Sequence, residues 1–174
     1  MNPTPELCAF HCPRYEELPT IELYMDQVIQ ILSHTITALF GPEDAVTNAM
    51  INNYVKHKVI PAPVKKKYSR DHICRLLFIC ILKRVFAISE ISALLNVQKD
   101  TCELSRAYNT FCLELENALQ AVFTHKSIDP VAVSPEFRRE VDAVHSMTLA
   151  IAHKVYVQRA LLTLSSAGHA LQAD

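Results

Sequence analysis

The chain contains only two glycines, Gly41 and Gly168, among its 174 residues. Glycine supplies the left-handed backbone positions that tight turns between strands require, so this scarcity disfavours a sandwich or barrel with many such turns. It also rules out a glycine-rich loop around a phosphate group. We therefore expect an all-α fold with few tight turns, and the composition, 50% apolar and 20% charged, is that of an ordinary globular protein.

The sequence contains no pattern typical of export or membrane insertion. The longest apolar run, Leu76 to Leu82, is far shorter than the roughly 18 residues that a membrane span needs. The string MNPTPELCAF at the start lacks the basic-then-apolar order of a signal peptide. We expect a cytoplasmic protein with no membrane partner and six reduced cysteines, of which Cys74, Cys80 and Cys112 act as small hydrophobes in apolar helices.

Catalytic and metal-binding motifs are missing. Cys8, His11 and Cys12 lie close together but have no second ligand pair at the spacing of a zinc site. The eight histidines are scattered, and the sequence contains neither a His-Glu-x-x-His pair nor a Gly-x-Ser-x-Gly elbow. We therefore expect no catalytic residues, no metal and no cofactor.

The near-neutral net charge of −1 conceals a strong segregation of charge along the chain. Residues 1–53 hold one basic and seven acidic side chains, residues 54–84 hold nine basic and one acidic, and residues 85–174 hold seven basic and ten acidic. A local excess of +8 in about thirty residues attracts polyanions, of which nucleic acid is the commonest. The alternative interpretation of this basic excess is a helix face that is exposed to solvent and binds no polyanion.

The N-terminal half divides into an irregular arm, residues 1–18, and a series of helices. Thr20 can cap a first helix, whose apolar residues recur at helical spacing until Gly41-Pro42 stops the pattern. Thr47 is the cap expected for a second helix with a narrow apolar stripe, formed by Met50, Ile51, Tyr54, Val55 and Lys58.

The opposite face of that second helix is polar and carries Asn48, Asn52, Asn53, Lys56 and His57. Asparagine is a poor helix former, but amide and amino groups on an exposed helix face suit hydrogen bonds to base edges and phosphates. Solvation alone, with weak helix propensity, is an equally good explanation of the same face.

An extended basic segment and two further helices follow. Two prolines and a basic, β-branched and aromatic string predict a short β-ribbon or wing between Val59 and Tyr68. Ser69 then caps a helix whose body, Ile73–Leu82, is apolar nearly all round and is therefore expected at the centre of the domain. Ser89 is expected to cap a fourth, short helix over residues 90–95.

The run from Thr47 to Leu95 resembles the winged helix-turn-helix of MerR-type regulators. The shared features are a helix ending in Asn-Tyr-Val-Lys-His-Lys-Val-Ile, a Pro-x-Pro corner, a basic link, Tyr68-Ser69 with a long apolar helix, and Ser89-Glu90-Ile91. More closely, TIELYMDQV, MINNYVKHKVIPAPVKKKYSRDHICRLLFICILK and AHKVYVQ are similar to a bacterial, largely Firmicute family described as a domain of unknown function. This resemblance covers roughly residues 19–120.

The resemblance and the charge pattern together assign roles in binding double-stranded DNA. Lys65, Lys66, Lys67 and Arg70 would neutralise phosphates. Asn48, Asn52, Asn53 and Lys56 would face the groove. Tyr54 would either pack the helix or reach a sugar-phosphate.

The C-terminal third shows two heptad-like series, from Leu104 to Val122 and from Phe137 to Leu162. Either they pack together as an intramolecular hairpin, or the second series joins two copies, as the C-terminal helices of MerR-type proteins do. We favour a homodimer, because paired basic modules would match paired DNA half-sites. The residues assigned to dimerisation are Phe137, Val141, Val144, Ile151 and Val155.

The sequence thus predicts an all-α protein with a minor β-ribbon: an arm at residues 1–18, a MerR-like winged helix-turn-helix at 19–97, and a C-terminal helical region at 98–174. The function expected is that of a DNA-binding regulator. Two alternatives stay open, a non-enzymatic interaction module that presents the same basic surface to an acidic protein, and a helical domain that senses a small molecule.

Overall fold

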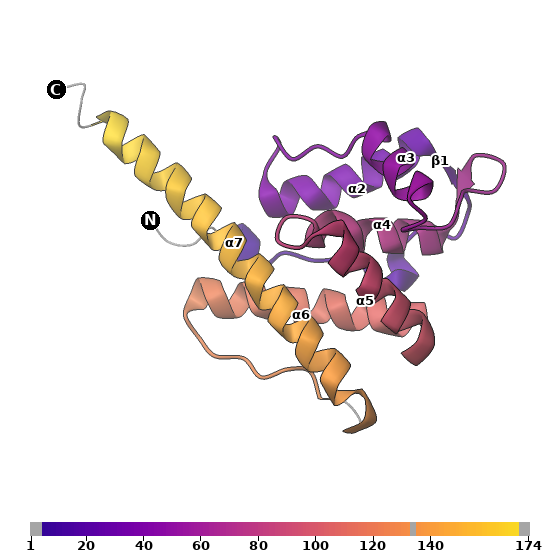
Figure 1. Ribbon diagram of the computed structural model, residues 1–174. Coiled ribbons are helices and arrows are strands. Elements are labelled where there is room, and N and C mark those ends of the chain that lie inside the picture. Colours follow the sequence, from indigo (N-terminus) through magenta and orange to yellow (C-terminus); the bar gives the residue numbers. More distant parts are fainter. Residues whose placement is uncertain (1–4, 133–134, 171–174) are drawn as a thin grey trace.

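Helix α4 (Arg70–Leu82) lies at the centre of the computed structural model, which describes residues 5–132 and 135–170 (Figure 1). Nine of its 13 residues are buried, including both cysteines and the whole run from Ile79 to Leu82. Helices α2 (Met25–Phe40), α5 (Ile88–Thr101), α6 (Leu104–Thr124) and α7 (Arg138–Ala170) all pack against it. The predictions of a mostly helical fold and of a central apolar helix are therefore confirmed.

The first long helix begins later than predicted. Leu23 and Tyr24 form strand β1, which pairs antiparallel with β2 (Lys67–Tyr68). Leu23 is buried by this pairing, so the backbone stays extended past Thr20, and the Tyr24 amide donates to Gln27 Oε1 at 3.0 Å where α2 starts. The predicted end is correct, because Gly41 terminates α2 with φ of 110°.

The fourth helix also differs from the prediction. Helix α5 begins at Ile88 and continues to Thr101, whereas the pattern indicated only residues 90–95 with Ser89 as the cap. The Glu90 carboxylate accepts a hydrogen bond from the Ala87 amide at 2.7 Å. This bond caps the helix at Ala87, two residues before Ser89. No glycine or proline follows until after Cys102, so nothing in the sequence stops the helix earlier.

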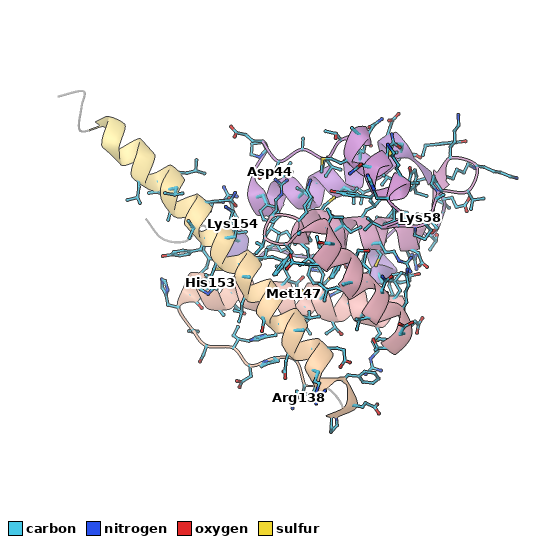
Figure 2. All side chains as sticks on the ribbon, in the orientation of Figure 1. Asp44, Lys58, Arg138, Met147, His153 and Lys154 are labelled. Atoms are coloured by element: carbon cyan, nitrogen blue, oxygen red, sulfur yellow. The ribbon has the colours of Figure 1, made fainter. Side chains whose placement is uncertain are left out.

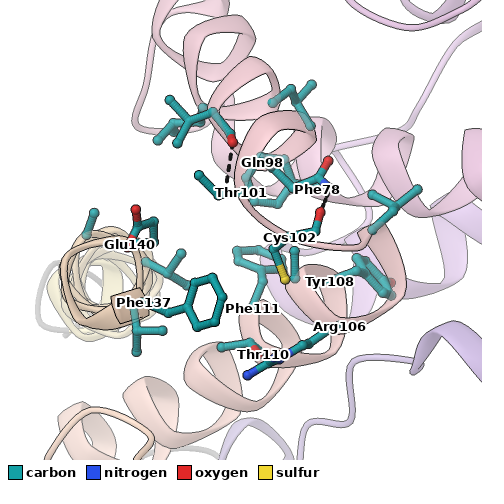
Figure 3. Close-up of a pocket in the computed structure, with 18 of the residues that line it drawn as sticks. Phe78, Gln98, Thr101, Cys102, Arg106, Tyr108, Thr110, Phe111, Phe137 and Glu140 are labelled. Atoms are coloured by element: carbon teal, nitrogen blue, oxygen red, sulfur yellow. Dashed lines mark hydrogen bonds between the residues drawn. The ribbon is translucent and has the colours of Figure 1, made fainter. Parts of the chain in front are cut away.

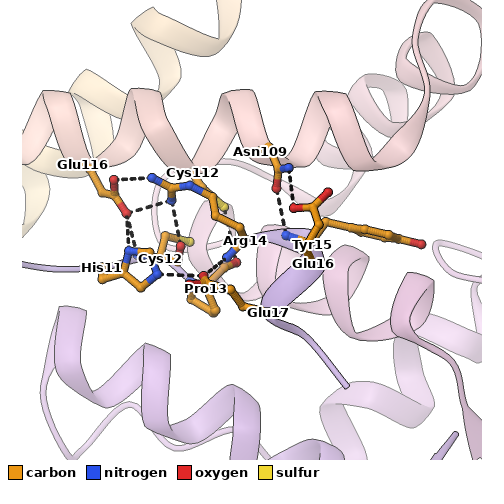
Figure 4. Close-up of polar contacts among 10 residues, drawn as sticks. All are labelled: His11, Cys12, Pro13, Arg14, Tyr15, Glu16, Glu17, Asn109, Cys112 and Glu116. Atoms are coloured by element: carbon orange, nitrogen blue, oxygen red, sulfur yellow. Dashed lines mark hydrogen bonds and ion pairs between the residues drawn. The ribbon is translucent and has the colours of Figure 1, made fainter. Parts of the chain in front are cut away.

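Residues 5–18, predicted as an irregular arm, pack along α6 over their described length. They include the short helices α1 (Pro5–Cys8) and η1 (Tyr15–Glu17), and Leu7, Cys12 and Leu18 are buried. Figure 4 shows the polar contacts that hold this segment: Arg14 binds both carboxylate oxygens of Glu116, at 2.8 and 2.5 Å.

Helices α6 and α7 form an intramolecular hairpin, which Figure 1 shows as two crossing rods on one side of α4. The link between them contains the 3₁₀ turn η2 (Pro135–Phe137). The first predicted heptad-like series lies in α6, and the second runs from η2 into α7 and contributes to this packing as far as Val155, whereas Leu162 at its end is 65% exposed. Of the five residues assigned to dimerisation, Val141, Ile151 and Val155 are buried within one chain, and Val144 packs against the same core.

The assignment of those side chains to a dimer seam is therefore corrected to the hairpin alternative. Their apolar surface is already covered by α6 of the same chain, so it cannot also cover a second copy. Phe137, the fifth residue, is half-buried, and the Arg106 guanidinium lies 5.0 Å from its ring centroid.

Candidate nucleic-acid interface

Helix α3 (Asn48–Lys56) presents the predicted polar face to solvent. Thr47 caps it as expected, since its side chain accepts the Met50 amide at 3.3 Å. Ile51 and Tyr54 are buried on the other side, where α3 packs against α2. All five members of the polar face are exposed, namely Asn48, Asn52, Asn53, Lys56 and His57.

Tyr54 is a core residue rather than a DNA contact. It is 5% exposed, and burial raises the pKa of its hydroxyl to about 12. Of the two roles predicted for it, packing of the helix is the one that its position allows.

Helix α3 ends in a motif that places Lys58 in the left-handed backbone region. The Val59 amide donates to the Tyr54 carbonyl at 2.9 Å and the Lys58 amide to the Val55 carbonyl at 3.0 Å, the pattern of a Schellman cap. Lys58 has φ of 56° at the position that glycine usually occupies. Lys58, expected in the apolar stripe, is instead exposed next to Lys56 and His57.

The predicted wing is a tight basic hairpin. Val64 and Lys67 exchange both backbone hydrogen bonds, at 2.9 and 3.1 Å, so that Lys65 and Lys66 form a two-residue turn. Both lysines have positive φ, 49° and 64°, as a type I′ turn requires. Such turns normally use Asn-Gly, and a residue with a Cβ carries a strain of about 1 kcal/mol or more there.

Two aromatic side chains hold the cations at the base of this hairpin. The Lys67 amino group lies 5.4 Å from the centroid of the Tyr24 ring in β1. The Arg70 guanidinium lies 5.2 Å from the Tyr15 ring, which belongs to the N-terminal segment. These cation–π contacts fix the direction of the side chains without neutralising their charge.

We call the group formed by these exposed and half-exposed residues the basic surface: Asn48, Asn52, Asn53, Lys56, His57, Lys58, Lys65, Lys66, Lys67 and Arg70. Both α3 and β2 pack against α2, and Figure 2 shows Lys58 at the end of the molecule where the hairpin projects, with Lys154 of α7 well separated from it. The predicted DNA-binding residues other than Tyr54 therefore lie at exposed or half-exposed positions on, or next to, elements that pack against α2.

Three basic side chains of residues 54–84 make structural contacts away from the basic surface. Arg84 pairs with Asp44 and stacks on Phe40, while the Lys83 amino group contacts the sulfur of Met50. Burial lowers the pKa of Lys83. Arg75 lies 3.8 Å from the Asp71 carboxylate and lines a cavity between α4, α5, α6 and α7. The charge count along the sequence could not separate these structural cations from the surface ones.

Clusters of three metal-ligating side chains and helices able to span a membrane are both absent from residues 5–132 and 135–170. No three His, Cys, Asp or Glu side chains within 5–132 and 135–170 are placed to hold a metal ion. All six cysteines are free thiols, and Cys12, Cys74, Cys80 and Cys112 are buried. No helix in the described part of the chain combines the length and apolarity needed to cross a bilayer.

Fold and surface together define a class: a helical domain, built on one buried helix, that carries a basic hairpin beside an amide-rich helix face. The chain belongs to the family described as Domain of unknown function (DUF1836), whose model matches residues 13–111, more than half of the sequence. The matched region contains the whole basic surface. No curated protein and no solved structure matches the chain.

Proposed function

We propose that this protein binds double-stranded DNA through the basic surface and acts as a non-enzymatic regulator. The observation that carries the proposal is that Lys58, Lys65 and Lys66 occupy left-handed positions on that one surface. Glycine or asparagine would fit each position with less strain. Strain that is retained at exposed charged residues is typical of a functional site.

The order of elements supports a winged helix-turn-helix of the MerR type as the binding module. Helices α2 and α3 are joined by a short turn, and the basic hairpin with Tyr68-Ser69 leads into α4. In this arrangement Asn52 and Lys56, one helical turn apart, share a face of α3 that can meet base edges. The hairpin lysines would lie on flanking phosphates.

The proposal is tested by DNA binding at several salt concentrations, measured by fluorescence anisotropy with labelled duplexes. Each phosphate contact adds about 0.9 to the slope of log affinity against log salt. Replacing Lys65, Lys66 and Lys67 together by Ala should lower that slope by about 2 to 3 units and weaken all sequences alike. Replacing Asn52 by Ala should cost about 1–3 kcal/mol, and only on a preferred site.

A sharper variant separates binding from stability. The double substitution Lys65→Asn and Lys66→Gly supplies the residues that a type I′ turn prefers. It should stabilise the fold by about 1 kcal/mol or more, because it relieves strain, and should still weaken DNA binding, because it removes two charges. In a less stable variant, weaker binding could result from unfolding. In a more stable variant it cannot, so the loss would have to come from the two missing charges.

The matched control is His125→Gly. His125 is the C-cap of α6 and has φ of 56°, the same left-handed strain at a site remote in sequence from the basic surface. It should gain similar stability and leave DNA affinity unchanged. If the unmodified protein binds no duplex at low salt, the regulator proposal is wrong, and an acidic protein becomes the partner to seek.

We also propose that the regulator is a homodimer, paired through the exposed side of the last turns of α7. Figure 1 shows this end of α7 extending beyond the rest of the molecule. Val157 and Leu164, seven residues apart and so on one side of the helix, are 51% and 68% exposed. Exposed apolar side chains in such a row favour a second copy over solvent.

A further inference from the structure

A cavity of about 390 Å³ lies between α4, α5, α6 and α7 (Figure 3). Its wall is mostly apolar, and Figure 3 shows the rings of Phe78, Phe111 and Phe137 around it. Aliphatic side chains such as Leu94 and Val141 complete the wall. A volume in this range suits one small molecule. Because an apolar wall cannot replace hydrogen bonds to water, the part of a ligand that it covers should be hydrocarbon.

The cavity is open to solvent. Val97 of α5, Arg106 of α6 and Arg139 of α7 belong to its lining and are exposed. A small molecule can therefore enter without unfolding the domain. The two guanidinium groups remain in contact with water, so they can meet the polar end of a molecule whose other end is covered.

The charge of the lining selects the sign of that polar end. Among the described residues, the lining contains three arginines, Arg75, Arg106 and Arg139, against one acidic side chain, Glu140. Arg75 already lies 3.8 Å from the Asp71 carboxylate. Arg106 and Arg139 form no ion pair with a described side chain. Two exposed guanidinium groups are thus available to an anion.

Arg106 is held beside the apolar wall. Its guanidinium lies 5.0 Å from the centroid of the Phe137 ring (Figure 3). A cation–π contact of this kind fixes the group but does not neutralise it, and its N–H donors can still bind a carboxylate. A ligand that joins a carboxylate to a hydrocarbon body matches both the cation and the wall next to it.

We propose that this cavity binds a medium-chain fatty acid, with its alkyl chain inside the cavity and its carboxylate on Arg106 and Arg139. A flexible chain suits this wall better than a flat ring does. Phe78 and Phe111 meet edge to face, with ring centroids 4.8 Å apart, so they pack on each other rather than forming two parallel faces. None of the lining residues belongs to the basic surface, so the proposal does not rest on DNA binding.

The test compares three probes that have the same number of carbons and differ in charge: octanoate, octanol and octylammonium. Isothermal titration calorimetry with the full chain gives the affinity and stoichiometry of each. A purely apolar site would prefer the uncharged octanol. We expect instead one octanoate per chain, bound about fivefold or more tightly than octanol, with octylammonium weakest.

Two further titrations examine the two ends of the ligand. Added salt should weaken the binding of octanoate but not of octanol, because salt screens only the contact with the arginines. Hexanoate should bind about tenfold or more weakly than octanoate, because each CH₂ group that leaves water contributes about a fourfold gain in affinity.

Variants locate the binding. Arg106→Gln with Arg139→Gln should remove the advantage of octanoate and its salt dependence while leaving octanol unchanged; both sites are exposed, so the melting temperature without ligand should stay the same. Arg138→Gln, an exposed neighbour outside the lining, is the matched control and should change neither probe. Val144→Phe should fill the cavity and weaken octanoate and octanol alike by at least about tenfold.

Four results would overturn the proposal. Tighter binding of octanol than of octanoate would show that the arginines do not select the ligand. Tightest binding of octylammonium would show that Glu140 dominates. Tighter binding of 2-naphthoate than of octanoate would show that the site takes a flat aromatic acid. Absence of saturable binding by every probe, or binding that Val144→Phe leaves intact, would show that the cavity is not the site.

Discussion

The basic surface keeps its charges in water, whereas the α6–α7 hairpin places a charged group in its core. Lys58, Lys65 and Lys66 are exposed and strained, and none of them forms an ion pair with a described side chain. Glu114 is completely buried, and its two oxygens accept from the Val131 amide at 2.5 Å and contact His145 Nδ1 at 2.7 Å.

The difference indicates what each region is for. In the first region three lysines keep strained backbone angles at exposed positions, which under the proposed function serves to present charge to DNA. The second satisfies its polar atoms internally and ties the interhelical link to both helices, which serves the fold. Variants should therefore affect folding in one region and binding in the other.

The largest effect is expected in α4, which supports both regions. Leu77 is completely buried, so Leu77→Asp places an unpaired carboxylate in the core and should cost more than about 4 kcal/mol, enough to unfold a typical domain. Circular dichroism and urea denaturation measure this. Leu113→Asp, at a site 38% exposed on α6, is the control and should stay folded. A cooperatively melting Leu77→Asp protein would show that the core lies elsewhere.

The next effect belongs to the hairpin. Glu114→Ala removes the acceptor for both the Val131 amide and His145, and the loss should be about 3–5 kcal/mol because buried partners are left unpaired. Glu114→Gln keeps the shape and one acceptor and should cost less. Urea midpoints give the ranking. Equal costs for both variants would mean that the charge itself, rather than the loss of an acceptor, is what the hairpin requires.

Effects of intermediate size are expected to distinguish the buried α6–α7 contact from the proposed dimer surface. Val155, 1% exposed, should tolerate no charge, so Val155→Glu should unfold the hairpin. Val157→Glu with Leu164→Glu should change stability by less than about 1 kcal/mol but convert a dimer into a monomer in sedimentation experiments. If the unmodified protein already sediments as a monomer at micromolar concentration, the dimer proposal fails.

These comparisons also show what could be read from the sequence. Helical periodicity and caps identified α2, α3, α4, α6 and α7, because apolar spacing and residues such as Thr47 and Gly41 act locally. Periodicity shows that a helix has an apolar face but not what packs against it, so the apolar face of α7 was predicted to contact a second copy of the chain. That choice depends on contacts between α6 and α7, which are distant in sequence.

The sequence also predicted the position of the candidate site but not the role of every residue in it. A run of basic residues marks a surface, but the roles of Arg84, Arg75 and Lys58 depend on partners and backbone angles that no local pattern records. A helical domain that senses a small molecule was only an open alternative, and no sequence pattern could locate the cavity, since its lining comes from four helices and η2, from Cys74 to Met147.

The smallest expected effect concerns pH and the join between the basic hairpin and α4. His72 is 8% exposed and its Nδ1 accepts the Ser69 amide at 3.1 Å, while its ring meets Tyr68 edge to face. Burial, the largest cause, lowers the pKa of His72, although the carbonyls of Ala62 and Pro61 and the Asp71 carboxylate oppose the shift and Arg75 adds to it.

Since the folded protein binds this proton less readily than the unfolded chain, the contribution of His72 is complete above the unfolded pKa of about 6.5. It should be lost as the pH falls through the lower, folded value, by no more than about 1.4 kcal/mol per pH unit. Urea denaturation at pH 7.5 and pH 5.5 measures the loss. His72→Gln retains an acceptor for the Ser69 amide but does not titrate, so it should reduce the difference between the two pH values. An unchanged difference in that variant would assign the acid sensitivity to other groups.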